Sequence, residues 1–435
     1  MGLRRNICRP DSFYIIISID YLRAEFLHGM RVRNWMLSWL ILVLACGRVS
    51  DRVDISGQNG AEYRLVVDMR GKEIRVPAKL ERIATVSDGL VETVFAHLGK
   101  IETIVALGST CVQRVFNYRF PVEEGVEFAY SEGMNPVALL YPEVRDLPLV
   151  ASSGTALNYE ALAVLNPQLL IARIGSCTLG SWDDDNTRKT LERVEALGIP
   201  VVVLMGPPCF STPTISYISE EIRILGQLFG MEAEALELSS FLEDAVDIIR
   251  QRIPELPEAE KPSMLLLGLS PLAREGGGAG NTRGRNTIES YFIEEIINAR
   301  NAYSGPGGRS AAVLLSTEQV YGLDPDVIVL PTASGYHPPE ELYTAPYYQG
   351  LRLLRAVQQR RIYALPWTPC NCSKRVEYPL ELLIMAKAAY PMGFADLTVH
   401  EWALDFYQKV YGVDREGARR IRSAQWLDWT VESDF

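Results

Sequence analysis

Small polar, cationic and aromatic residues directly follow the short apolar runs of this sequence. In open α/β folds a ligand lies beyond the carboxyl ends of the strands, so residues at these positions are candidates for ligand binding. The candidates are Ser87, Asp88, Gly89, Ser109, Thr110, Ser153, Arg173, Ser176, Arg283, Arg285, Asn286, Ser334, Tyr336 and Trp367. Aromatic faces cover apolar rings, and arginine pairs with anionic groups. We expect a large, flat or chelated ligand, although each residue also has a structural explanation, such as packing for Trp367 or an ion pair for Arg173.

Catalysis is the main alternative chemistry for the same strand ends. Asp88, His97 and Cys111 lie close to them and would suggest an enzyme. However, no nucleophile and base stand at a recognisable motif, and the sequence has no G-x-S-x-G turn. We predict that the protein is not an enzyme, and an α/β enzyme of unknown reaction remains an alternative.

Direct metal binding is the second alternative. A metal-ion carrier would need several converging His and carboxylate ligands, but the four histidines stand far apart at positions 28, 97, 337 and 400. The seven cysteines are scattered too, and the neighbouring pair Cys370 and Cys372 could form only a strained disulfide. We predict no metal site, no cofactor and no disulfide framework, and a direct metal-ion binding protein remains an alternative.

Composition limits the class of protein. The chain has 43 Lys and Arg against 54 Asp and Glu, a formal net charge of −11, so a nucleic-acid partner is not expected. A hydrophobic content of 48% excludes a disordered chain, and 435 residues exceed what one hydrophobic core usually organises. Two core-forming lobes with extensions are the expected arrangement.

Short apolar runs alternate with amphipathic segments of helical length. The runs are residues 82–86, 101–108, 169–173, 201–205, 263–270, 327–331 and 361–365. Strands separated in this way favour a parallel sheet that is covered on both faces. The predicted fold class is α/β, with two lobes whose central sheets are mostly parallel and are joined by one long helix.

The joining helix is predicted from residues 231–253. Apolar residues recur there at steps of three and four, and acids stand opposite them. At 1.5 Å per residue such a helix would be about 34 Å long. Pro254 and Pro257 end it.

An internal repeat links the two halves. The segment EALAVLNPQLLI begins at Glu160, and EQVYGLDPDVIV begins at Glu318. In both, a glutamate opens a short helix, a proline seven residues later ends the turn, and an apolar strand follows. We predict the same helix, turn and strand in each lobe.

The region before residue 63 reads as an export signal. From Met30 a cationic flank precedes a short apolar core, which is too short to span a bilayer, and Cys46 follows. The four residues 43–46, VLAC, resemble a bacterial lipobox, whose cysteine is lipidated after cleavage. We expect an exported protein, periplasmic or on the cell surface, that Cys46 anchors to the membrane. A buried hydrophobic segment is the alternative.

Residues 63–395 resemble the periplasmic binding proteins that serve iron-siderophore, haem and vitamin B12 importers. The resemblance rests on the opening VVDMRGKEIRVPAKLERIATVSDGLVETVFAHLG, on NYEALAVLNPQLLIA, on the long helix, on RNTIESYFIEEIINA and on STEQVYGLDPDVIVL. It implies a monomer that binds an iron chelate, haem or corrinoid and partners an ABC permease with its ATPase. It also implies that Glu160 and Glu318 each meet an arginine of the permease.

The expected divisions follow from these features. They are an upstream extension (1–29), a signal peptide (30–45), a linker (46–62), a first lobe (63–230), a bridging helix (231–256), a second lobe (257–395) and a helical tail (396–435). The insertion at 111–147 is longer than the family pattern, so it could cover the cleft or bind a partner. The tail, with Trp402, Trp426 and Trp429, is predicted to pack as helices against the second lobe.

Overall fold

The computed structural model describes residues 62–123, 126–269, 279–305, 312–331, 339–369, 371 and 373–435. The described residues all belong to one compact unit, Gly60–Phe435. The predicted signal peptide, Cys46 and most of the linker lie outside the described residues. So do Ser334, Tyr336, His337, Cys370 and Cys372.

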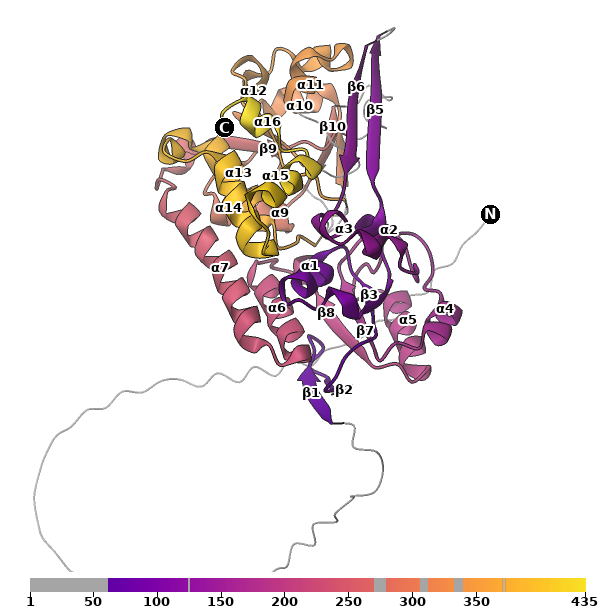
Figure 1. Ribbon diagram of the computed structural model, residues 1–435. Coiled ribbons are helices and arrows are strands. Elements are labelled where there is room, and N and C mark those ends of the chain that lie inside the picture. The colour runs from indigo at the N-terminus through magenta and orange to yellow at the C-terminus, as the bar shows by residue number, and fades with distance from the viewer. Residues whose placement is uncertain are drawn as a thin grey trace, which may run out of the picture. The chain divides into compact units, whose positions relative to one another are not determined.

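The first lobe contains a four-stranded parallel sheet with strand order β4-β3-β7-β8, of which Figure 1 labels β3, β7 and β8. Its strands are β3 (Ile83–Val86), β4 (Ile104–Leu107), β7 (Leu169–Ile174) and β8 (Val201–Met205). Its helices are α1 (Leu90–His97), α2 (Thr110–Gln113), α4 (Tyr159–Leu165), α5 (Asp185–Ala196) and α6 (Ser216–Phe229). An antiparallel pair, β1 (Tyr63–Val67) and β2 (Glu73–Pro77), precedes the sheet. Strands β3 and β7 are buried throughout and, apart from Thr85 and Arg173, apolar, as expected for a sheet covered on both faces.

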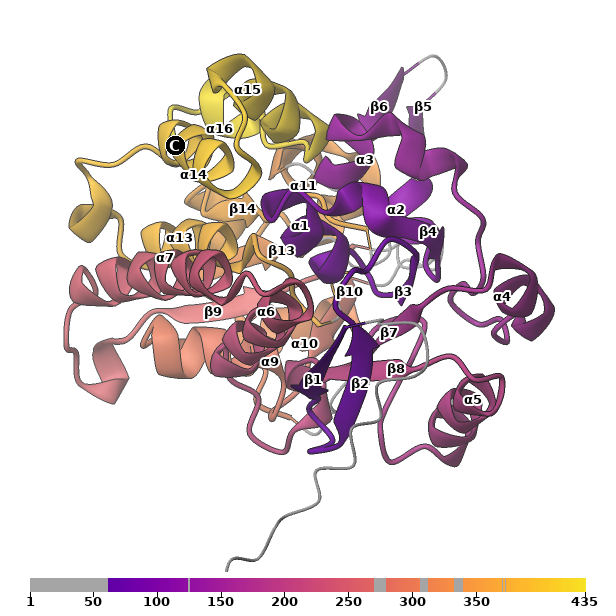
Figure 2. The same ribbon diagram turned by 60° about the horizontal axis from the view of Figure 1, so that its bottom comes forward.

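The second lobe repeats this plan with strand order β11-β9-β13-β14, again parallel (Figure 2). Its strands are β9 (Ser263–Leu266), β11 (Arg300–Asn301), β13 (Val327–Leu330) and β14 (Ile362–Ala364), with a separate antiparallel pair of β10 (Gly280–Arg283) and β12 (Ala312–Leu315). Its helices are α9 (Ile288–Tyr291), a π-helix (Phe292–Ile296), α10 (Thr317–Leu323), α11 (Pro339–Thr344), α12 (Arg355–Gln358) and α13 (Tyr378–Ala389). The predicted fold class is confirmed.

Helix α7 (Glu232–Gln251) joins the lobes and buries the predicted face, including Ala235, Leu238, Leu242, Ala245 and Ile249. Its 20 residues make it about 30 Å long, shorter than predicted because it stops before Ile253.

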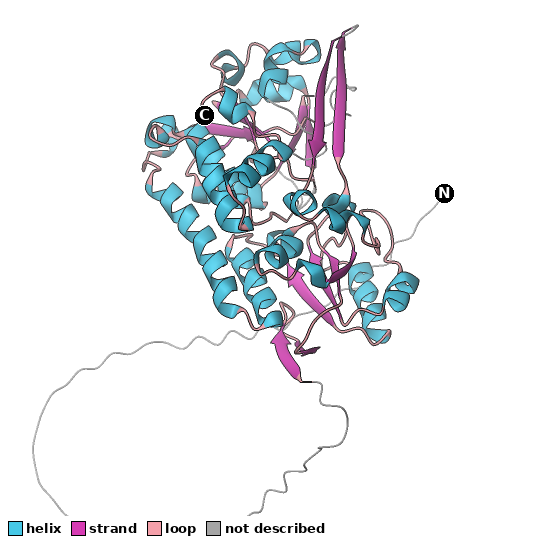
Figure 3. Cartoon of the chain, viewed as in Figure 1, coloured by secondary structure: helices cyan, strands magenta, loops and turns pink. Residues whose placement is uncertain are grey.

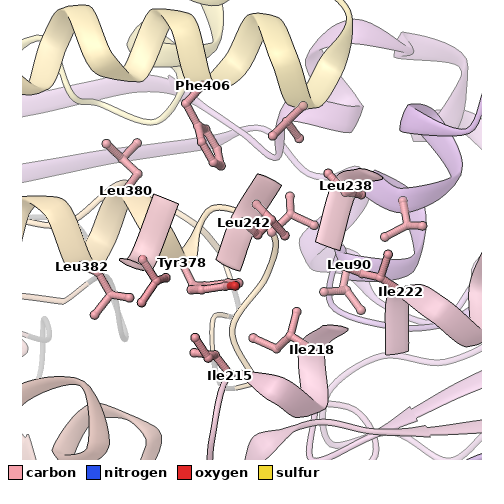
Figure 4. Close-up of a cluster of buried hydrophobic side chains, with 14 of the residues drawn as sticks. Leu90, Ile215, Ile218, Ile222, Leu238, Leu242, Tyr378, Leu380, Leu382 and Phe406 are labelled. Carbon is pink, nitrogen blue, oxygen red and sulfur yellow. The ribbon is translucent and has the colours of Figure 1, made fainter. Parts of the chain in front are cut away.

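The helix is not the only connection between the lobes. Figure 4 shows Leu238 and Leu242 of α7 beside Ile218 and Ile222 of α6, with Tyr378 and Leu380 of α13 nearby. One hydrophobic cluster therefore runs from the first lobe through α7 into the second. Each lobe also has a smaller hydrophobic cluster of its own. The two lobes are therefore joined by shared core packing as well as by the chain of α7.

The insertion forms a long antiparallel hairpin of β5 (Phe116–Glu123) and β6 (Val126–Gly133), followed by α3 (Pro136–Leu140) and a 3-10 turn (Pro142–Asp146) (Figure 3). Phe116, Tyr118, Phe128 and Tyr130 pack against the core cluster of the second lobe, although the hairpin starts in the first. The hairpin thus extends from the first lobe and packs on the second.

The tail forms α14 (Val399–Tyr411), α15 (Arg415–Ala424) and α16 (Trp429–Glu432), as predicted. It packs against the first lobe as well as the second: the Met134 N–H donates to the Ala424 carbonyl at 3.2 Å, and His97 Nδ1 lies 2.8 Å from the Val410 carbonyl. In the described part of the chain, no helix combines the length and apolarity that crossing a membrane requires.

Candidate ligand-binding cleft and docking helices

The loop after β3 is fixed by its own side chains and leaves no room for a larger residue. Ser87 Oγ accepts hydrogen bonds from the N–H groups of Gly89 and Val91, each at 3.3 Å, and so caps α1. Gly89 has a φ of 116°, a conformation that favours glycine. A Cβ there would lie 2.5 Å from Asn135 Nδ2 and 2.8 Å from Arg375 Nη1. The backbone at Gly89 is therefore closely covered by groups from two other segments.

Asp88, which follows β3, accepts hydrogen bonds from residues that follow two other strands. Its side chain is 1% exposed, and it accepts the Cys177 N–H at 2.7 Å and the Ser109 hydroxyl at 3.4 Å. Burial raises the pKa of the Asp88 carboxyl, and this is only partly opposed by the bond from Cys177 and by the positive charges of Arg173 and Arg375. The sequence placed Asp88 at a strand end correctly, and its partners come from the ends of β4 and β7.

Arg173 at the end of β7 is fully buried and makes contacts with both lobes. Its guanidinium donates two hydrogen bonds of 2.7 Å to Glu221 on α6. It also donates to the carbonyls of Lys374 at 2.7 Å and Ser373 at 3.0 Å. Burial raises the pKa of Glu221 in spite of this pairing. In this structure the guanidinium is occupied by protein partners.

Residues 373–377, which we call the interlobe segment, belong to the second lobe and contact the first. Ser373 Oγ donates to the Gly175 carbonyl, and Arg375 Nη1 donates to the Asp88 carbonyl at 3.4 Å. Lys374 Nζ pairs with Glu381 at 2.8 Å and with Glu289 at 3.4 Å. The described contacts of this part of the chain come from Ser373, Lys374 and Arg375, which follow Cys370 and Cys372 in the sequence.

Trp367 after β14 is packed, with 2% of its surface exposed. Its ring stacks on Trp426 of the tail with centroids 5.0 Å apart, and it meets the rings of Phe116 and Tyr118 edge-on at 5.5 Å each. Trp426 Nε1 donates to the Ser131 carbonyl of β6 at 2.8 Å. The insertion and the tail thus enclose a residue at the end of a second-lobe strand.

The remaining candidates are spread over both lobes. Ser176 is buried and donates to the Leu179 carbonyl at 3.3 Å. Thr110 and Arg283 are partly exposed, and Ser153, Arg285 and Asn286 are exposed. The structure therefore brings together Ser87, Asp88, Ser109 and Arg173, and places the second-lobe arginines at the surface.

The repeat predicted from the sequence forms the same unit twice. In α4 Asn158 accepts the Ala161 N–H at 2.9 Å, and in α10 Ser316 accepts the Gln319 N–H at 3.3 Å. Each helix has seven residues and ends at a left-handed residue, Asn166 (φ 44°) or Asp324 (φ 35°). These helices, here called the docking helices, present the predicted pair Glu160 and Glu318 to solvent. Backbone and Ser316 hydrogen bonds lower the pKa of the Glu318 carboxyl.

Two observations bear on the alternatives. Cys111 is disulfide-bonded, so its sulfur is not a thiolate nucleophile. Among the described residues, no group of three or more His, Cys, Asp and Glu side chains is placed to hold a metal ion.

The sequence analysis missed four residues of this region: Glu221, Lys374, Arg375 and Asn135. Lys374 and Arg375 closely follow the cysteine pair Cys370 and Cys372 in the sequence. Their positive charge was the signal that could have drawn attention to them. Glu221 and Asn135 carried no signal, because a glutamate on an amphipathic helix and an asparagine before a proline are ordinary at those positions.

Comparison with known proteins identifies the family. The model of the family described as "Periplasmic binding protein" matches residues 133–368. A periplasmic solute binding protein from Veillonella parvula has a TM-score of 0.65 and 21% identity, covering 86% of this chain and 100% of its own. Molybdate-bound MolA from Haemophilus influenzae (TM-score 0.59, 17% identity) covers 81% of this chain and 98% of its own. CeuE from Helicobacter pylori in a Ni-His complex has a TM-score of 0.57 and 18% identity, covering 82% of this chain and 99% of its own. No curated protein matches.

The chain belongs to the periplasmic binding protein family. Members of this family are exported solute-binding proteins of ABC transporters and not a class of enzymes. The sequence resemblance to this family is confirmed.

Proposed function

We propose that the protein captures an iron-siderophore, haem or corrinoid between its two lobes and delivers it to an ABC permease, acting as a monomer and catalysing no reaction. The main support is the convergence of strand ends from both lobes, where Asp88 and Arg173 of the first lobe meet the interlobe segment of the second. In parallel α/β sheets this is the edge at which ligands bind.

The charge of the second-lobe candidates favours an anionic chelate. Arg283 ends the second-lobe strand β10 and Arg285 follows it, and both carry positive charge. Guanidinium groups pair with carboxylates and phosphates. The family alone does not select the ligand, because the similar structures named above carry molybdate in one case and a Ni-His complex in another.

A titration tests the ligand class. The purified protein is titrated with a ferric siderophore, haem and cobalamin, and quenching of tryptophan fluorescence is followed. Saturable quenching by one of the three, at one equivalent and without chemical change of the ligand, is the expected result. Turnover of a ligand, or no saturable response to any of the three, would contradict the proposal.

The two glutamates of the docking helices are proposed to contact arginines of the permease. Glu160 and Glu318 stand at equivalent positions of equivalent helices, so two rigid contacts would fix the orientation of docking. A glutamate near a helix N-terminus also stabilises its own helix, so exposure alone does not prove the role. Unimpaired uptake by a double Glu160→Ala, Glu318→Ala variant would defeat it.

Anchoring through a lipid on Cys46 is the last part of the proposal. Its support is the sequence pattern of residues 30–46. Mass spectrometry of the native protein should find an acylated Cys46 at the N-terminus. An intact residue 1 would contradict both the cleavage and the anchor.

A further inference from the structure

A highly exposed aliphatic side chain lies on one docking helix, and another lies on a segment in contact with the other docking helix. Val164 is 86% exposed and Leu353 is 74% exposed, and both are among the most exposed large apolar residues of the described chain. Single exposed apolar side chains are common on protein surfaces. What distinguishes this pair is that one member lies at each docking helix.

In the first lobe the arrangement comes from helical spacing. Val164 is four residues after Glu160 on α4, so the two side chains share a face of the helix. Leu162 on the same helix is fully buried and fixes α4 against the lobe. Val164 therefore contributes little to packing within the lobe, and its apolar surface is available to a partner.

In the second lobe the aliphatic side chain comes from another segment. The position of α10 that corresponds to Val164 is Gly322, which has no side chain. The Leu353 N–H instead donates to the hydroxyl of Tyr321, one turn after Glu318, at 3.1 Å. The neighbouring Leu354 is fully buried, so the two leucines point to opposite environments.

Arg355 holds this segment on α10. Its backbone N–H and Nε donate to Asp324 at 3.1 and 2.8 Å, and its Nη1 donates to Asp326 at 2.8 Å. Leu353 is thus placed beside the docking helix by a set of polar contacts. Different local sequences produce the same combination of carboxylate and aliphatic group in both lobes.

We propose that Val164 and Leu353 are the apolar contacts through which the two docking helices bind the permease, each entering an apolar recess beside an arginine. This inference rests on the proposed docking of Glu160 and Glu318. Exposed ion pairs steer association but contribute little to affinity, whereas apolar surface removed from water at an interface stabilises the complex. The glutamates would set the orientation, and the aliphatic groups would slow dissociation.

The test compares double variants on the permease–ATPase complex of the same organism, reconstituted in lipid nanodiscs. Association and dissociation rates are measured for the wild type, Val164→Ser/Leu353→Ser and Glu160→Ala/Glu318→Ala. The matched control is Leu236→Ser/Met392→Ser, which changes two residues that are 65% and 87% exposed and lie away from both docking helices. All variants should keep the unfolding midpoint of the wild type, because the changed side chains are exposed.

The apolar variant should dissociate at least tenfold faster, with little dependence on salt, and the control should match the wild type. The glutamate variant should instead associate more slowly, and the difference should shrink at high salt. If the apolar variant behaves like the control while the glutamate variant is impaired, the inference fails and the proposed docking stands. If both variants bind as the wild type does, the proposed docking itself fails.

Discussion

Charged residues of this protein occupy two contrasting regions. At the junction of the lobes, Arg173 and Glu221 are fully buried and Lys374, Glu381 and Arg375 nearly so. On the docking helices, Glu160 and Glu318 are exposed and make no ion pair among the described residues. The comparison teaches that the same residue types serve different purposes: buried charges hold the lobes in register, and exposed charges are available to a partner.

The largest effect should follow from breaking the buried pair. Arg173→Ala leaves the Glu221 carboxylate and the Ser373 and Lys374 carbonyls without their donor. Removing one partner of a buried ion pair costs about 3–5 kcal/mol, because the remaining charge is uncompensated. Urea unfolding of the variant should show this loss of unfolding free energy.

Arg223→Ala is the matched control, because Arg223 lies on the same helix α6 but forms an exposed pair with Glu220. It should change the unfolding free energy by less than about 0.5 kcal/mol. Equal effects of the two substitutions would remove the contrast between buried and exposed charges.

A smaller loss is expected at the contact of the tail with the insertion. Trp426→Ala removes the stack on Trp367 and the hydrogen bond to Ser131. We expect a loss of about 2–3 kcal/mol, below the range for a fully buried aromatic, because Trp426 is only partly buried. Hydrogen exchange should also accelerate in residues 126–133. Unchanged exchange there would show that the tail does not hold the hairpin.

Asp88→Asn tests the electrostatics of the buried junction by its pH dependence. Because the folded-state pKa of Asp88 is raised, its contribution to stability is fully present below the unfolded-state value near 3.8 and is lost as pH rises through the folded pKa. The asparagine variant lacks this loss, and its amide oxygen can still accept the Cys177 N–H. Its unfolding free energy relative to the wild type should therefore increase between pH 4 and pH 8.

Glu221 keeps the causes of its raised pKa in the variant. The pKa of Glu92 is raised mainly by burial and in part by the negative charge of Asp88, so Asp88→Asn lowers it, which changes the stability in the same direction as the loss of the Asp88 titration. Glu160→Gln, which changes an exposed carboxyl, is the control. A constant difference between Asp88→Asn and wild type across this pH range would mean that Asp88 titrates normally in the folded protein.

The smallest effect on stability belongs to the docking helices. Glu160→Ala/Glu318→Ala should alter the unfolding free energy by less than about 0.5 kcal/mol per site, because both side chains are exposed. Thermal unfolding measures this. A loss of several kcal/mol would show that the glutamates support their helices and would weaken their assignment to docking.

The local elements could be predicted from the sequence because their signals are local. The buried strand β8 is an unbroken apolar run and β7 is apolar except for Arg173, α7 has a stripe at helical spacing, and the repeat places Glu160 and Glu318 in register. The contacts between residues far apart in the sequence could not be predicted in this way. Arg173 meets Glu221 across 48 positions and Lys374 across 201, and neither periodicity nor turn chemistry encodes such distant partners.

The extensions show the same limit. The sequence marked the insertion as too long and the tail as helical, but their mutual packing through Trp426 depends on the tertiary fold. Candidates such as Ser87 and Ser109 were found because they follow strands, and the same positions make them helix caps. Choosing the residues that follow strands locates the edge of the sheet where ligands bind. It does not distinguish residues that contact a ligand from residues that stabilise the loops.

Hydrogen exchange with and without saturating chelate tests the central claim most directly, namely that a solute is held between the two lobes. The chelate is whichever of the ferric siderophore, haem and cobalamin saturates the tryptophan quenching. The account predicts slower exchange on loading at the strand ends of both lobes, at residues 87–89 and 109–110 in the first and 283–286 in the second, with no change in α4 or α10. Protection confined to one lobe, or none at these strand ends, would contradict it.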